Sequence, residues 1–236
     1  MLSPTLDTII TIEHQGSIDL VELRTKYGHG FKGIVGKLDA QGLIKKNHSR
    51  ERECYYTLTQ EGQRFIDQTL GSLHRTDKPW HGQWLAITMR IPERNRSDRD
   101  KLRRLLKRNG FGCLYGSLWI RPAGSNIEIA EIKKLARRGQ ITVIEGRADD
   151  DPQIAQSAWD LEELRKKYET YITQTTKKLS TLPDTPQKLK MEIKKIIFEL
   201  ATITVQEPAL PSDLLPADWP KGRAFTLYQK VRRKLF

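Results

Sequence analysis

The sequence predicts an α+β protein built from three consecutive segments. Residues 1–74 show helical spacing interrupted by one hairpin, residues 79–148 alternate strands with helices, and residues 152–236 contain amphipathic helices. The chain has 236 residues, of which 37% are apolar and 30% are charged. This length suits two or three domains of about 100–150 residues, each with a buried core and a charged surface.

The first segment opens with three predicted helices. Apolar residues from Leu6 to Ile12 indicate the first, which we expect to end near Gly16. Ser17 is the predicted N-cap of the second helix, which the Gly28–Gly30 stretch ends. The third helix is indicated by four apolar residues at helical spacing: Phe31, Ile34, Val35 and Leu38.

A predicted hairpin follows the third helix. Gly42 ends that helix and Ile44 begins a strand, residues 45–52 form a polar turn, and residues 54–58 return as a second strand. Thr59 is then the predicted N-cap of a fourth helix. The order helix, helix, helix, hairpin, helix resembles the winged helix-turn-helix, as do the motifs Leu38-x-x-x-Gly42-Leu43-Ile44 and Tyr56-x-Leu58-Thr59-x-x-Gly62.

This resemblance implies that residues 1–74 bind double-stranded DNA. The third helix of such a fold enters the major groove, and its hairpin contacts the backbone or minor groove. The candidate DNA-binding residues are His29, Lys32, Lys37, Lys45, Lys46, His48, Arg50 and Arg52. The helix offers no outward Arg, Asn or Gln, but it does offer Gly33 and Gly36. A winged helix that serves only for dimerisation or protein docking is the alternative.

The middle segment predicts a βαββαβ order, the ferredoxin-like pattern. Strands are expected at residues 83–91, 111–114, 117–120 and 140–144. Ser97 is the predicted N-cap of the first helix, whose inward residues are Leu102, Leu105 and Leu106. A capping box, Ser125-x-x-Glu128, predicts the start of the second helix.

Most of the excess positive charge lies in this middle segment. The chain has a net charge of +12, of which residues 79–147 carry +9, with 15 basic and 6 acidic residues. Such a balance favours a polyanionic partner, with nucleic acid first. The candidate phosphate or anion contacts on the first helix are Arg96, Arg99, Arg103, Arg104, Lys107 and Arg108. The alternative is a solvated basic face.

The C-terminal segment predicts three long helices and a proline-rich link. An acidic turn, Asp149–Asp151, precedes Pro152 and suits the positive end of a helix. Helices are then expected around residues 161–179, 186–200 and 224–235, with the link at residues 208–220. Three aromatic residues are candidates for lining an effector pocket, although aromatics at helical spacing also suit a core: Trp159, Tyr168 and Trp219.

Several motifs make the chain similar to the phenylacetic-acid-degradation repressor family (PaaX-like). They include Trp80-x-Gly82-x-Trp84, Ile91-Pro92-Glu93, Leu118-Trp119-Ile120-x-Pro122 and the block Pro208–Pro220. The resemblance implies a dimeric transcriptional repressor that releases DNA when a CoA thioester binds. The family usually has Asp before Ile-Pro-Glu, where this chain has Arg90. Arginine cannot hold a divalent cation, so metal-dependent cleavage there is doubtful.

Other function classes find little support in the sequence. Cys54 and Cys113 are too few for a disulfide framework, and neither a membrane-length apolar run nor a signal peptide is recognisable. We expect a cytoplasmic protein without cofactor, metal or catalytic residues, and with no membrane partner. Two alternatives to the repressor stay open: a ferredoxin-like nuclease with a DNA-binding arm, and a protein that binds nucleic acid without sequence preference.

Overall fold

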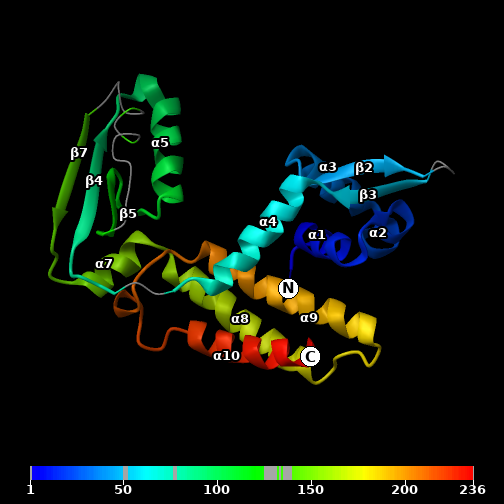
Figure 1. The fold of residues 1–236 in the computed structure, drawn as a ribbon. Helices are drawn as coiled ribbons and strands as arrows, with labels where there is room; N and C mark the ends of the chain where they lie inside the picture. Colours follow the sequence, from blue (N-terminus) through cyan, green and yellow to red (C-terminus); the bar gives the residue numbers. More distant parts are fainter. Residues whose placement is uncertain are drawn as a thin grey trace. The chain divides into compact units, whose positions relative to one another are not determined.

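The computed structural model describes residues 2–49, 53–76, 79–124 and 140–235, together with Ile132 and Lys134. They divide into two compact units. Unit 1 contains residues 1–75, 167–206 and 220–236, and unit 2 contains residues 76–166 and 207–219. Each unit combines helices with one antiparallel sheet, which confirms the predicted α+β class (Figure 1).

The N-terminal part of unit 1 follows the predicted element order. Its elements are α1 (Pro4–Gln15), β1 (Ile18–Asp19), α2 (Leu20–Tyr27), α3 (Phe31–Ala40), β2 (Ile44–His48), β3 (Cys54–Leu58) and α4 (Gln60–Gly71). A 3-10 turn at Gly28–Gly30 separates α2 from α3. The sheet has the antiparallel order β1-β3-β2. The short strand β1 is the element that the sequence did not predict.

The helix caps of this region explain one correct and one wrong prediction. Thr59 caps α4, because its hydroxyl accepts a hydrogen bond of 3.0 Å from the Gly62 amide. The prediction for Ser17 was wrong, because Asp19 caps α2 instead and accepts from the Glu22 amide at 2.7 Å. Ile18 and Asp19 pair with β3, which moves the helix start two residues along the chain.

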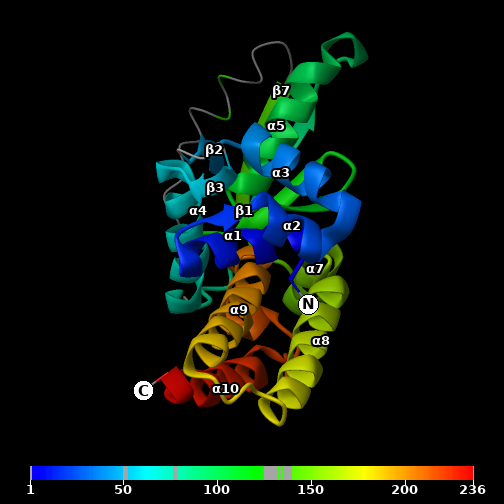
Figure 2. The ribbon, with the colours of Figure 1, turned by 90° about the vertical axis from the view of Figure 1, so that its right-hand side faces the viewer.

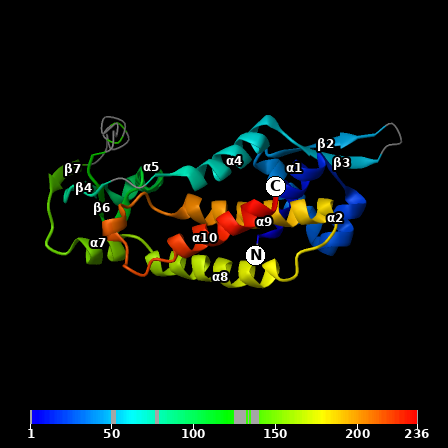
Figure 3. The ribbon, with the colours of Figure 1, turned by 60° about the horizontal axis from the view of Figure 1, so that its bottom comes forward.

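The C-terminal helices contribute to the core of unit 1. They are α8 (Leu161–Leu179), of which only the part from Lys167 belongs to this unit, α9 (Pro186–Gln206) and α10 (Lys221–Arg232). Helix α9 contacts α1, α4 and α10 (Figures 2 and 3). Phe198 of α9 is fully buried in one cluster with Ile9 and Ile66. The core beneath the N-terminal helices therefore depends on residues almost 200 positions away.

Unit 2 is built around a four-stranded sheet. Its elements are β4 (Trp84–Arg90), α5 (Arg96–Arg108), β5 (Gly112–Tyr115), β6 (Leu118–Pro122), β7 (Gln140–Gly146) and α7 (Asp151–Ala158). The strand order is β5-β6-β4-β7, and all neighbouring strands are antiparallel. This order fits the ferredoxin-like prediction. The helix predicted from Ser125 lies outside the described residues, apart from Ile132 and Lys134.

The two faces of β4 pack into different clusters. Leu85, Ile87 and Met89 pack with the apolar stripe of α5, whereas Trp84 packs on the opposite face with Ala155 of α7 and with residues of the proline-rich link. Alternation along the strand produces this division. The Ser97 cap prediction was wrong, because Asn95 occupies the N-cap position after a 3-10 turn at Glu93–Asn95.

Candidate nucleic-acid interface

The outward face of α3 exposes two lysines, two glycines and one acidic residue, Asp39. Phe31 and Leu38 are buried and fix the inner face of the helix in the core of unit 1. The predicted residues Lys32 and Lys37 are exposed, and so is His29 in the turn before the helix. Burial of the apolar stripe thus directs these polar side chains towards solvent.

Two glycines on the same helix have no packing role among the described residues. Gly33 and Gly36 are exposed, and a Cβ atom added at either would meet no described atom within 4 Å. Each glycine inside a helix costs about 1 kcal/mol relative to alanine. The residues that the structure describes give no steric reason for this cost.

The β2–β3 hairpin supplies a second group of exposed cations. Lys45, Lys46 and His48 are exposed on β2, which contacts α3. The strands stay paired towards the tip, where the Ser49 amide donates to the Glu53 carbonyl at 2.9 Å. The remaining two predicted residues, Arg50 and Arg52, lie outside the described part of the chain.

A partly buried carboxylate ties the helices behind this surface together. Asp7 of α1 accepts a hydrogen bond from the Tyr27 hydroxyl at 2.5 Å and contacts the ammonium groups of Lys26 and Lys195 at 2.7 and 2.9 Å. Burial alone would raise the pKa of Asp7, but the bonds from Lys26, Tyr27 and Lys195 outweigh it and lower that pKa below its usual range. Helices α1, α2 and α9 therefore share one ion-pair network.

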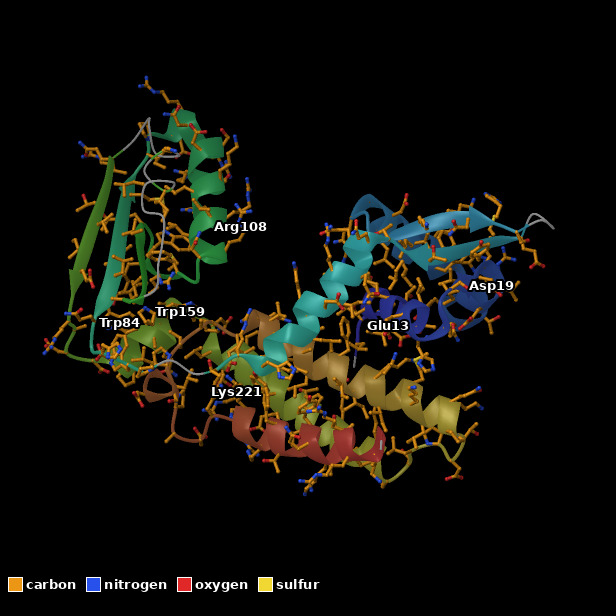
Figure 4. All side chains as sticks on the ribbon, in the orientation of Figure 1. Glu13, Asp19, Trp84, Arg108, Trp159 and Lys221 are labelled. Atoms are coloured by element: carbon orange, nitrogen blue, oxygen red, sulfur yellow. The ribbon has the colours of Figure 1, made fainter. Side chains whose placement is uncertain are left out.

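The predicted basic residues of α5 divide into two groups. Arg96, Arg104, Lys107 and Arg108 are exposed, and Figure 4 shows Arg108 at the C-terminal end of the helix. Arg99 and Arg103 are partly buried and line a cavity of 280 Å³ together with Arg90. The i, i+4, i+8 spacing predicts one shared face for Arg99, Arg103 and Lys107. The first two line the cavity, whereas Lys107 is exposed and does not.

The three predicted effector residues are not brought together. Tyr168 is completely buried in unit 1. In unit 2, Trp159 stacks on Trp84, with ring centroids 6.3 Å apart. Figure 4 labels both residues. Trp219 lines a separate cavity of 410 Å³, where the Arg165 guanidinium lies 5.7 Å from its ring centre.

Comparisons with known proteins identify the family. A family model described as the PaaX protein central Cas2-like domain matches residues 77–158. A second, the PaaX-like protein C-terminal domain, matches residues 159–236. The chain belongs to the PaaX-like family.

A curated relative and a solved structure extend this result. The transcriptional repressor PaaX of Escherichia coli (strain K12) is 24% identical over 201 residues, which cover 76% of this chain and 62% of the relative. The chain therefore spans less than two thirds of that protein's length. A solved structure, uncharacterized protein Rv0674 from Mycobacterium tuberculosis, has a TM-score of 0.53 at 17% identity and covers 97% of this chain and 92% of its own, which shows a shared fold.

In this PaaX-like chain, the sequence reasoning missed a carboxylate that orients two tryptophans. Asp151 accepts indole N–H bonds from Trp84 at 2.7 Å and from Trp80 at 3.3 Å. The acidic turn before Pro152 indicates a helix start or, without the rest of an EF-hand loop, a calcium site, and neither interpretation pairs Asp151 with a tryptophan. The motif Trp80-x-Gly82-x-Trp84 was the available signal, because buried indoles need an acceptor.

The sequence did not predict which residues surround Arg90. In the structure Arg90 is the last residue of β4. Among the described residues, no group of three or more His, Cys, Asp or Glu is arranged to hold a metal ion.

No described helix has the length and apolar character needed to cross a membrane.

Proposed function

We propose that this chain is a transcriptional repressor in which residues 1–74 form a winged helix-turn-helix that binds duplex DNA. One observation carries the proposal: all six candidate DNA-binding residues that the structure describes are exposed. They lie on α3, on the turn before it and on β2, which contacts α3. The similarity to the repressor of Escherichia coli supports the same function. Lysine and histidine side chains of this kind suit contacts to phosphates, which provide affinity that depends on salt.

The remaining chain would pair two copies and receive a signal. In a dimer, two α3 helices would reach half-sites about 10 base pairs apart, centre to centre. By family resemblance, an acyl-CoA effector would release the DNA. The candidate effector site is the cavity of 410 Å³ that Trp219 and Arg165 line. There an aromatic ring and a guanidinium group lie close together. A DNA-binding repressor would act in the cytoplasm.

Removal of the hairpin cations tests the DNA-binding proposal. The double variant Lys45→Ala/Lys46→Ala should bind DNA at least tenfold more weakly. The slope of log K against log salt should shrink by about 1 for each phosphate that the variant no longer neutralises. Fluorescence anisotropy with a labelled duplex at several salt concentrations measures both quantities.

A matched control separates a local contact from a lower overall charge. Lys177→Ala/Lys230→Ala removes two exposed lysines of unit 1 from α8 and α10. We expect this variant to bind like the wild type. Equal weakening in the two double variants would contradict a DNA contact by the hairpin.

A further inference from the structure

A small cavity in unit 2 lies where β4 ends. It has a volume of 280 Å³, and residues of β4, of α5 and of the β5–β6 turn enclose it. Helix α5 runs beside the sheet at this place (Figure 1). The lining residues are Met89, Arg90, Ile91, Arg99, Arg103, Gly116 and Ser117.

The charged residues that line this cavity are all basic. Three of its seven lining residues are arginines, and none is acidic. Two carboxylates stand next to it: Glu93 pairs with Arg99, and Asp100 lies 3.9 Å from Arg103, which is beyond hydrogen-bond distance. An arginine is always protonated, so the three arginines and these two carboxylates leave an excess of one positive charge at the cavity.

Glu93 holds one arginine in a fixed orientation. Its two carboxylate oxygens accept from both terminal nitrogens of Arg99, at 2.7 and 3.1 Å. This two-point contact uses one edge of the guanidinium and leaves the Nε–H group for another acceptor. Glu93 itself is 75% exposed and does not line the cavity, so it contacts Arg99 from the solvent side.

Donors in the cavity wall lack acceptors. The Nε atoms of Arg99 and Arg103 are buried, and within the described part of the chain neither has a hydrogen-bond partner. Arg90 is exposed at the strand end and pairs with no carboxylate among the described residues. A buried N–H without an acceptor is unfavourable. Because both Nε atoms are closed to solvent, an anion in the cavity would satisfy them once the arginine side chains turn towards it.

We propose that this cavity binds a phosphate group. Several oxygens on one tetrahedral anion suit several arginines, because guanidinium groups bind phosphate through paired N–H bonds. The volume of 280 Å³ lies at the lower end of the range of about 300–1,000 Å³ that is common for drug-sized ligands, which suits a small group. The phosphate has two conceivable sources: a small phosphorylated molecule or the backbone of nucleic acid. The proposal goes beyond DNA binding by α3 and the hairpin and does not depend on it.

Titration of the full chain with inorganic phosphate tests the proposal. Isothermal calorimetry and ³¹P line broadening, at constant ionic strength with chloride as the reference, should show saturable binding to the wild type. Arg90→Ala/Arg103→Ala should bind phosphate at least tenfold more weakly. The matched variant Lys101→Ala/Arg147→Ala, which removes two exposed cations of unit 2 outside the cavity, should bind like the wild type.

Further variants keep the test decisive. If Arg90→Ala/Arg103→Ala does not fold, the single change Arg90→Gln at the exposed strand end serves instead and should also weaken binding. Absence of saturable phosphate binding to the wild type, or equal binding to the cavity and control variants, would overturn the proposal. Neither result would bear on DNA binding by the hairpin, because these titrations contain no DNA.

A second arm distinguishes the two sources of phosphate. If the source is nucleic acid, duplex DNA should displace inorganic phosphate, and Arg90→Gln should reduce the salt slope of DNA binding by about 1. If the source is a small phosphate ester, Arg90→Gln should weaken phosphate binding while the DNA affinity stays unchanged. Either pattern supports the cavity as a phosphate site.

Discussion

Gly33 and Gly36 are the residues at which stability and function should oppose each other. Alanine at either position favours the helix and meets no described atom, so the double variant should raise the free energy of unfolding by about 1–2 kcal/mol. If the α3 backbone approaches DNA closely, the same variant should bind DNA more weakly. Urea unfolding and anisotropy measure the two effects.

A glycine outside the proposed interface provides the control. Gly222 is exposed in α10 and also has open space for a Cβ atom. Gly222→Ala should stabilise the chain without changing its DNA affinity. An unchanged affinity in Gly33→Ala/Gly36→Ala would show that close approach at α3 is not needed.

Asp7 should make unit 1 sensitive to acid. Its pKa is lowered in the folded chain, so its contribution to stability is present above the unfolded pKa of about 3.9 and is lost as the pH falls through the lower folded value. Asp7→Asn should cost about 1–3 kcal/mol at pH 7 and flatten the decline of stability below pH 4. Thermal melts from pH 2 to pH 7 check this. A variant that declines as steeply as the wild type would contradict the role of Asp7.

Among the elements, β5 and the end of α7 should tolerate no added atom between them. A Cβ atom at Gly112 would lie 2.6 Å from the Ala158 carbonyl oxygen and from the Trp159 ring. Gly112→Ala should therefore lower the free energy of unfolding by about 1–3 kcal/mol and shift the tryptophan fluorescence. Gly146→Ala at the end of β7, where no described atom lies within 4 Å, is the control.

Local sequence patterns predict some helix and strand bounds correctly and others not. The bounds of β3 and the Thr59 cap follow from alternation and capping chemistry, which are local. The start of α2 does not, because the pairing of Ile18 and Asp19 with Tyr56 and Tyr55 depends on a strand almost 40 residues away. Ser17 and Asp19 are both good caps, and only this pairing decides between them.

At the scale of the whole molecule, sequence order and spatial grouping differ. The three predicted segments follow the chain, whereas unit 1 combines the N-terminal helices with α9 and α10. The periodicity of apolar residues indicates that α9 is amphipathic, but it does not predict which helices its apolar face packs against. The candidate sites follow the same rule. Spacing predicts one face for Arg99, Arg103 and Lys107, but which of them meet Arg90 at the cavity depends on the tertiary fold.

Sequence selectivity is the direct test of the central claim that this chain is a DNA-binding repressor. Duplexes enriched from a random pool by the purified chain should bind at least about 10³-fold more tightly than scrambled duplexes at the same salt concentration. Competition anisotropy measures the ratio. Equal affinity for enriched and scrambled duplexes would contradict the claim and would favour binding without sequence preference.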